Sequence, residues 1–258
     1  MLYYVKKAEG ERCMERLDKL IAACGAASRR EVKTLVKQGR VRVDGVLAAT
    51  ADMKVDEAAA VITVDGVELK YEKFIYVLLH KPAGVLTATE DKRQATVLDL
   101  LPEEYRKRGI APVGRLDKDT EGLLLLTDDG ELTHRLLSPK YHVDKVYYAR
   151  VEGTPDEADQ AAFAAGMELS DFTCMPAALT LLDEGECLVT VREGKFHQVK
   201  RMLAARGKPV TYLKRLSMGP LQLDEDLEAG KWRLLEKEEV LALQTVCGLA
   251  SYDKAVKK

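Results

Sequence analysis

Two short amphipathic helices are predicted near the N-terminus from the spacing of apolar residues. In RLDKLIAACG the apolar residues recur at helical spacing, and Gly25 is a typical residue at a helix C-terminus. The next segment, SRREVKTLVKQG, predicts a second helix that ends at Gly39. Ser28 begins this helix, and Glu31 three residues later completes the pattern of a capping box.

Alternating polar and apolar residues after Gly39 predict β-strands. RVRVDGVLA alternates on both sides of Asp44-Gly45, and VITVDGVEL does so around Asp65-Gly66. An Asp-Gly pair between two such runs favours a two-residue hairpin turn. Residues 70–73 then form a candidate linker, so a small N-terminal head of two helices and two hairpins is predicted.

The rest of the chain, the body, combines β-like runs with helical segments. FIYVLLHKPAG, GLLLLT, KVYYARVEG and CLVTVREG predict strands, whereas PDEADQAAFAAGM and HQVKRMLAARG predict helices. Because strands and helices do not alternate strictly, the pattern favours an α+β fold over a doubly wound sheet.

Composition indicates a globular protein, and the charge distribution separates the head from the body. The chain has 258 residues, 47% apolar and 32% charged, which suffices for one large or two smaller domains. The net charge of −2 does not itself indicate a nucleic-acid partner. Residues 16–42, however, hold eight basic residues and only two acidic ones, so any RNA-binding surface is expected there.

Targeting and metal-binding patterns are weak. The apolar stretches are far shorter than a membrane span, and residues 1–14 have no apolar segment of the signal-peptide kind, so we expect a cytoplasmic protein without membrane association. The five cysteines are scattered without a C-x-x-C pair, and the four histidines lack zincin spacing. We therefore expect reduced thiols and no metal.

The second predicted helix presents one basic face opposite its apolar stripe. A cluster of this kind binds phosphates with little base specificity, although a solvated helix face is the alternative for any single residue. The segment RLDKLIAACGAASRREVKTLVKQGRVRVDGVLA resembles the S4 RNA-binding domain. The resemblance implies an RNA-binding surface that includes the helix N-terminus; its residues are Ser28, Arg29, Arg30, Lys33, Lys37, Arg40 and Arg42.

Four ordered segments of the body carry a second resemblance. They are HKPAGVLTA, VGRLDKDTEGLLLLTDDGELTHRLLSPKYHVDKVYYARVEG, the Lys-x-Tyr element KVYYARV near the end of that segment, and EGKFHQVKRML. Together they resemble the RsuA/RluB/RluE/RluF family of ribosomal RNA pseudouridine synthases, from Glu15 to about Val240. The resemblance implies an S4-like domain at 14–70 and a catalytic domain at 73–250, built on a mixed, largely antiparallel sheet with flanking helices.

Pseudouridine formation defines what the body must supply. The reaction breaks the bond between ribose C1′ and uracil N1, turns the base and rejoins it through C5, so it needs no redox cofactor and no metal. By resemblance, Asp117 in GRLDKDT is the catalytic aspartate. Its carboxylate can add covalently to the ribose or stabilise positive charge there, and the sequence leaves both routes open. Considered alone, an Asp in such a turn is often a loop cap.

Two partners of Asp117 follow from the same resemblance. Lys200 matches a basic position that pairs with the carboxylate and keeps it ionised; many relatives have arginine there. Tyr147 matches an active-site tyrosine, which can stack on uracil or relay a proton. Strand alternation sends Tyr147 and Tyr148 to opposite faces, so at most one of them faces the cleft. The alternatives are an exposed helix lysine and a core tyrosine.

Four further residues are implied as substrate-binding. Arg115 is expected to fill the space vacated by a flipped base, with a salt bridge as its alternative role. Leu203 is expected to wall the uracil pocket, although considered alone it is a core residue. His134 and Arg135 lie in a segment that approaches RNA in relatives.

HQVKRM, the short tail and the S4-like head favour the branch of the family that modifies one uridine of small-subunit (16S) ribosomal RNA. Large-subunit (23S) RNA and a non-catalytic S4-type assembly factor are the alternatives. An aspartate glycosidase fits less well, because no second carboxylate is evident. We expect a monomer whose partner is ribosomal RNA or a ribosomal assembly intermediate.

Overall fold

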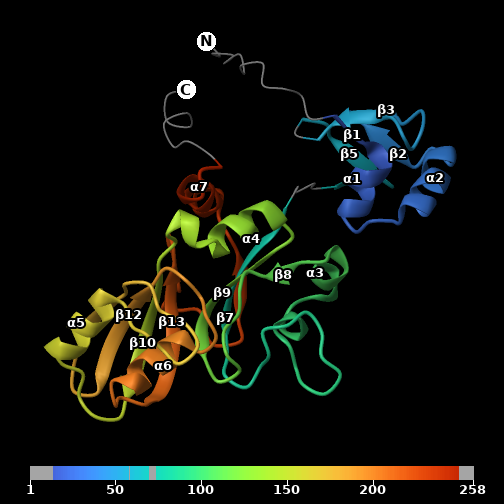
Figure 1. Ribbon diagram of the computed structural model, residues 1–258. Coiled ribbons are helices and arrows are strands. Elements are labelled where there is room, and N and C mark those ends of the chain that lie inside the picture. The colour runs from blue at the N-terminus through green and yellow to red at the C-terminus, as the bar shows by residue number, and fades with distance from the viewer. Residues whose placement is uncertain (1–13, 58, 70–73, 250–258) are drawn as a thin grey trace. The chain divides into compact units, whose positions relative to one another are not determined.

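The computed structural model describes residues 14–57, 59–69 and 74–249, and the chain divides into two compact units, Met1–Lys73 and Phe74–Lys258 (Figure 1). The candidate linker 70–73 and the predicted domain limits at 70, 73 and 250 lie outside the described residues. Within the described part, no helix combines the length and apolar character needed to cross a bilayer.

The first unit has the predicted two helices followed by hairpins. Leu17 on the first helix and Val32 on the second belong to one buried apolar cluster, which explains the spacing of apolar residues in both. The elements are β1 (Met14–Arg16), α1 (Leu17–Ala23), α2 (Arg29–Lys37), β2 (Val41–Val43), β3 (Val46–Leu47), β4 (Lys54–Asp56), β5 (Ile62–Val64) and β6 (Val67–Leu69). β1 pairs with β4, and a four-stranded sheet has the order β3-β2-β5-β6.

Local sequence signals in this unit are confirmed. The backbone N–H of Ser28 donates to Glu31 Oε2 at 2.7 Å, and that of Glu31 donates to Ser28 Oγ at 3.3 Å, which completes the capping box. Asp44 and Asp65 adopt φ angles of 51° and 53°, the left-handed conformation that a two-residue hairpin turn requires.

The second unit is built on one mixed sheet with the strand order β11-β12-β10-β13-β9-β7-β15. In addition, β8 pairs with β9, and β14 pairs with β13. Every pairing is antiparallel except β13 with β9, which confirms the expected largely antiparallel α+β domain. The strands are β7 (Tyr76–Lys81), β8 (Ala111–Pro112), β9 (Glu121–Thr127), β10 (Lys145–Val151), β11 (Ala178–Leu181), β12 (Glu186–Val191), β13 (Val210–Met218), β14 (Leu221–Gln222) and β15 (Trp232–Leu234).

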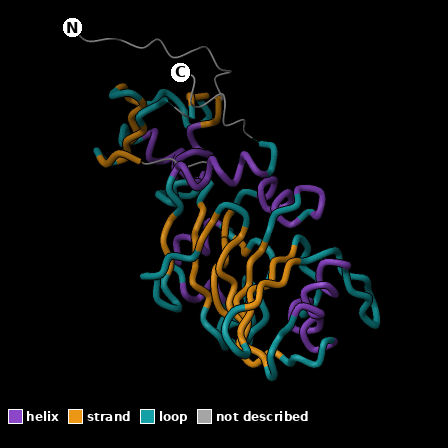
Figure 2. Tube along the Cα trace, turned by 90° about the vertical axis from the view of Figure 1, so that its left-hand side faces the viewer, coloured by secondary structure: helices purple, strands orange, loops and turns teal. Residues whose placement is uncertain are grey.

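Helices cover both faces of this sheet (Figures 1 and 2). On β9, Leu124 and Leu126 join a core that includes Phe163 of α5, whereas Leu123 and Leu125 join a separate core with residues of α4 and α7. A strand buried on both faces reads as a continuous apolar run, which is why GLLLLT shows no alternation. The helical elements are η1 (Val97–Leu100), α3 (Glu103–Arg108), α4 (Gly130–Leu137), η2 (Pro139–Tyr141), α5 (Glu157–Ala165), α6 (Gln198–Ala205) and α7 (Lys237–Val246).

The longest strand, β13, lies at the centre of the sheet and was not predicted. It carries Lys214 and Arg215, and basic residues obscure the apolar pattern of a central strand. Arg215 is nonetheless buried, and its Nε donates to the backbone carbonyl of Leu123 at 2.7 Å. Pairing with distant strands therefore decides the conformation of this segment.

Gly122 allows β9 and β13 to approach at their parallel contact, where it pairs with Arg215. A Cβ added at Gly122 would lie 2.2 Å from the carbonyl oxygen and 2.5 Å from the nitrogen of Arg215, and Gly122 also has a φ of 110°. Only glycine fits this position without moving one of the two strands.

We predict that Gly122→Ala lowers the free energy of unfolding by about 3 kcal/mol or more, because the backbone of a central strand must shift. Chemical denaturation measures the change. Gly130→Ala is the matched control: a Cβ at Gly130 meets nothing within 4 Å, and the first residue of α4 is helical. The control should be neutral or slightly stabilising, and equal stability of both variants would contradict the prediction.

Candidate active site

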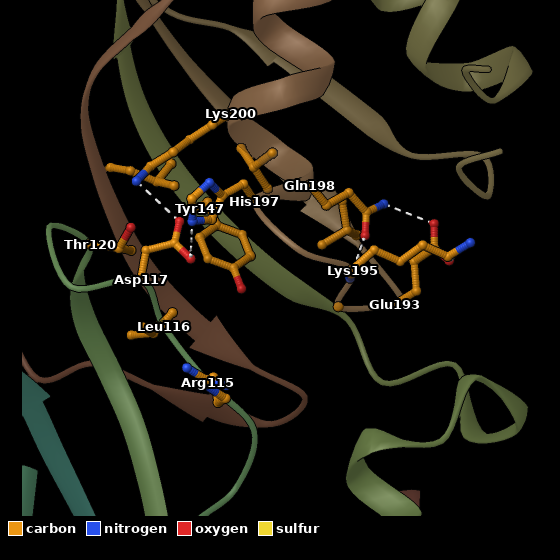
Figure 3. A pocket seen from close by; sticks show the side chains of 14 residues that line it. Arg115, Leu116, Asp117, Thr120, Tyr147, Glu193, Lys195, His197, Gln198 and Lys200 are labelled. Carbon is orange, nitrogen blue, oxygen red and sulfur yellow. Dashed lines mark hydrogen bonds and ion pairs between the residues drawn. The ribbon is translucent and has the colours of Figure 1, made fainter. Parts of the chain in front are cut away.

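Asp117 lies in the loop that joins β8 to β9, and its side chain faces a pocket (Figure 3). The backbone N–H of Thr120 donates to the carbonyl of Asp117 at 3.1 Å, forming a turn. The Thr87 hydroxyl bonds to the backbone of Leu116, donating to its carbonyl at 2.7 Å. The loop thus holds a carboxylate that is 26% exposed at the pocket wall.

Lys81, at the end of β7, anchors the same loop from beneath. Its side chain is fully buried, and its ammonium donates to the carbonyls of Lys118 at 3.2 Å, Thr120 at 2.9 Å and Pro82 at 3.0 Å. Burial lowers the pKa of Lys81 to about 8, and the Asp119 and Asp117 carboxylates oppose that shift. The sequence of HKPAG does not predict this role of Lys81, because the contacts join segments nearly 40 residues apart.

Lys200 lies on α6 and reaches the loop from the other side of the pocket. Its Nζ is 3.1 Å from Asp117 Oδ2 and 2.5 Å from Asp119 Oδ1, so the expected ion pair is present and a second acid joins it. Burial acts to lower the pKa of Lys200, but the hydrogen bonds to Asp119 and Asp117 outweigh it and raise the pKa. Lys200 also holds the pKa of Asp119 below its usual value. The lysine therefore remains a cation beside Asp117 at neutral pH.

His197 is a second partner of Asp117 that the sequence did not predict. Its Nε2 lies 3.5 Å from Asp117 Oδ1, on the opposite carboxylate oxygen from Lys200. It directly precedes α6 and adopts a φ of 50°, a left-handed conformation uncommon outside glycine. HQVK belongs to the third motif segment, but sequence spacing does not show which of its side chains turns toward the loop.

Tyr147 faces the pocket from β10, with 9% of its surface exposed (Figure 3). Tyr148 points to the other face of the strand, where it makes an edge contact with Tyr212 and its hydroxyl accepts a hydrogen bond from Arg150 Nε. The predicted opposition of the two tyrosines is confirmed. Tyr147 thus places an aromatic ring beside the carboxylate of Asp117.

The apolar wall of the pocket comes from three elements. Leu203, expected to wall the uracil pocket, is fully buried in the core and is not among the residues that line this pocket, and its role stays a prediction. Val199, one turn nearer the start of α6, lines the pocket together with Leu213 of β13 and Val191 of β12. The pocket opens at the N-terminal end of the helix, so a residue one turn farther along packs into the core instead.

Buried polar groups complete the pocket. Thr120 lines the pocket, and its hydroxyl is buried without a hydrogen-bond partner within the described residues. Glu193 braces the opposite side: its Oε1 accepts from Gln198 Nε2 and from the Met175 backbone, both at 2.8 Å. These bonds fix the turn that presents His197.

The other predicted substrate-binding residues occupy different surroundings. Arg115 is exposed at the pocket rim, and no described carboxylate lies within ion-pair distance of it. His134 is exposed on α4, outside the pocket. Arg135 donates to the carbonyls of Cys247 and Gly248 and pairs with Glu131, so it ties down the end of α7. RNA contact by His134 and Arg135 stays a prediction.

All seven residues predicted to bind RNA on the head are exposed. Within the described chain, the four basic residues of α2 take part in no ion pair, whereas Arg40 pairs with Asp65 and Arg42 donates to the Gly45 carbonyl at 2.9 Å. The uncompensated charge of the head is therefore concentrated on α2, at Arg29, Arg30, Lys33 and Lys37.

The site gathers charged, aromatic and apolar side chains around one pocket. The Asp117 carboxylate lies between Lys200 and His197, and a tyrosine ring and apolar side chains line the same pocket. In the described residues, no group of three or more His, Cys, Asp or Glu side chains could hold a metal ion.

Residues 75–205 match the family model described as RNA pseudouridylate synthase, and residues 15–61 match the S4 domain. The first match spans more than half of the chain and includes Asp117, Tyr147 and Lys200. The chain belongs to the RNA pseudouridine synthase family. It is an enzyme of that family, and an S4 RNA-binding domain precedes its synthase domain.

Curated relatives of this pseudouridine synthase cover nearly the same length. A Bacillus subtilis (strain 168) protein, uncharacterized RNA pseudouridine synthase YtzG, is 48% identical over 87% of this chain and 96% of its own. The ribosomal small subunit pseudouridine synthase A of Vibrio cholerae is 41% identical over 88% and 99%. The ribosomal large subunit pseudouridine synthase B of Bacillus subtilis is 38% identical over 90% and 97%.

A solved structure supports the fold of the synthase. A crystal structure of pseudouridylate synthase aligns with a TM-score of 0.62 and 35% identity, covering 89% of this chain and 99% of that one. The agreement extends the relationship from the sequence to the arrangement of the sheet and helices.

We predict that Lys81→Met lowers the turnover of the synthase by ~10- to 100-fold, because the loop that carries Asp117 loses its anchor and misplaces the carboxylate. Removing the ammonium also takes a donor from the carbonyls of Pro82 and Thr120, whereas the Lys118 carbonyl keeps the backbone N–H of Gly84; the loss costs roughly 1–3 kcal/mol of stability. Turnover is measured as pseudouridine formed per enzyme, and stability by denaturation. Lys107→Met, at an exposed lysine of α3, is the control. Equal turnover in the two variants would refute the anchoring role.

Proposed function

We propose that this protein isomerises a uridine of small-subunit (16S) ribosomal RNA to pseudouridine, with Asp117 as the catalytic carboxylate. The observation that carries the proposal is the contact of Asp117 with Lys200 at 3.1 Å and His197 at 3.5 Å, in a pocket that Tyr147 also lines. Lys200, whose pKa is raised, thus places a positive charge beside the carboxylate that must reach a ribose.

The proposed chemistry conserves atoms and needs one well-placed anion. The bond between ribose C1′ and uracil N1 breaks, the base turns, C5 bonds to C1′, and the C5 proton leaves for solvent while N1 gains one. Asp117 either adds to the sugar or stabilises the positive charge that develops at C1′. Lys200 holds the Asp117 carboxylate in place, and the raised pKa of Lys200 keeps its own ammonium charged through the neutral range.

The walls of the pocket suit a uracil that has left its helix. Tyr147 offers a ring face for the detached base, and Val199 and Leu213 exclude water from one side. Arg115 stands at the rim with no carboxylate partner among the described residues, consistent with a role in filling the gap that the flipped base leaves.

Two observations support small-subunit RNA as the substrate. The third element reads HQVK, with His197 and Lys200 both at the carboxylate, and the small-subunit synthase of Vibrio cholerae is 41% identical. Large-subunit RNA is the second candidate, since a large-subunit synthase is 38% identical. With either substrate, the partner of the enzyme is ribosomal RNA or an assembly intermediate. The proposed enzyme is a monomer in the cytoplasm.

We predict that wild-type protein forms pseudouridine at one position of 16S RNA from a strain lacking this gene, and that Asp117→Asn lowers the rate by at least ~10³-fold while RNA binding persists. Chemical mapping of pseudouridine in both ribosomal RNAs measures the product. Asp183→Asn, an exposed acid outside the pocket, is the control. Product only in 23S RNA would replace the substrate assignment. Equal product from Asp117→Asn and wild type would exclude Asp117 as the catalytic group.

We also predict that the basic face of α2 supplies phosphate contacts. Replacing Arg29, Arg30, Lys33 and Lys37 with Gln should reduce the salt dependence of RNA binding, lowering the slope of log K against log salt by up to about 3. Filter binding across a salt series measures the slope. Removal of four exposed basic residues from the catalytic domain, Lys92, Arg93, Arg106 and Lys107, is the comparison. An equal change of slope in both variants would show that basic residues of the head contribute no more to RNA binding than basic residues of the catalytic domain.

A further inference from the structure

Phe196 is the most exposed large apolar side chain in the described part of the chain, at 74%. It lies in the turn that leads into α6, the helix that supplies Lys200. Its ring stacks on the ring of His197, with centroids 3.8 Å apart and an interplanar angle of 18°. One face of a large aromatic ring is thus supported by the protein, at the edge of the proposed active site.

The stack is connected directly to the catalytic carboxylate. His197 lines the pocket, and its Nε2 contacts Asp117 Oδ1 at 3.5 Å. The His197 ring thus contacts the Asp117 carboxylate and stacks on the Phe196 ring. His197 adopts a φ of 50°, whereas two other described residues with positive φ, Asp44 and Asp65, lie in hairpin turns. An uncommon backbone conformation at this position turns the two adjacent rings in the same direction.

We propose that Phe196 and His197 form a stacking platform for an unpaired nucleobase next to the target uridine. This inference rests on the proposed function. Flipping a uridine out of a stack removes one neighbour from each flanking base, and an aromatic ring can replace that neighbour because every base has a π-face. The platform lies next to the carboxylate, within the reach of a flanking nucleotide.

Charge around the platform fits a nucleic-acid chain. Lys195, the residue before Phe196, places its Nζ 4.6 Å from the Phe172 ring centroid, and Arg115 stands on the rim of the same pocket without a described carboxylate partner. Both cations line the same pocket as His197, and Lys195 Nζ also lies 3.9 Å from Glu193 Oε2. The platform residue is substrate-positioning: it holds the flanking base, and Asp117 performs the chemistry.

The first experiment separates binding from chemistry with the full-length protein and the ribosomal RNA fragment that it modifies. Phe196→Ala should raise KM by ~10-fold and change kcat by less than about threefold, whereas Phe196→Tyr should match wild type. Phe196→Leu keeps apolar bulk without a ring and should behave like Phe196→Ala. Leu182→Ala, another exposed apolar residue, is the control. A wild-type KM for Phe196→Leu would overturn the stacking role.

The second experiment identifies the base. Fragments with an abasic site at each nucleotide flanking the modified uridine are compared with the intact fragment, using wild-type protein and Phe196→Ala. At one flanking position the abasic site should raise the KM of wild type ~10-fold and leave that of Phe196→Ala unchanged. If Phe196→Ala suffers the same loss on every fragment, the platform is refuted. Failure of the proposed function is distinct, because wild-type protein then forms no pseudouridine in the intact fragment.

Discussion

The ion pair between Asp117 and Lys200 is the interaction on which the candidate site depends. It joins a loop that precedes β9 to a helix that follows β12, so it also closes the pocket between two separate parts of the sheet. The pair places the ammonium of Lys200 3.1 Å from the carboxylate. His197 approaches the second oxygen, which fixes the direction of the carboxylate as well as its charge.

The scaffold holds this pair through backbone contacts at the centre of the sheet. Gly122 lets β9 lie against β13, and Lys81 fastens the loop to the end of β7. Neither residue needs to touch the substrate. Both determine where the carboxylate stands, which matters because misplacement of a reacting group by about 1 Å can cost ~10²-fold in rate.

Features set by neighbours in the sequence were predictable, and features set by distant contacts were not. The capping box of Ser28 and the Asp-Gly hairpins depend on residues a few positions apart, and the sequence predicts them. The Asp117–Lys200 pair was expected only through a family resemblance. The burial of Arg215 in β13 and the contact of His197 with Asp117 depend on strand order and on one backbone angle, neither of which periodicity encodes.

The parallel contact between β9 and β13 constrains the order in which the enzyme folds. Lys214 of β13 pairs with Glu121 of β9. Along the chain, β10, β11 and β12 lie between these two strands. Contacts of such long sequence separation form slowly, because the intervening chain must first be closed into a loop. During synthesis the carboxylate at 117 emerges well before its counter-ion at 200, so a ribosome-bound chain that lacks α6 and β13 has no assembled pocket. Catalytic competence is therefore acquired only after α6 and β13 have been synthesised.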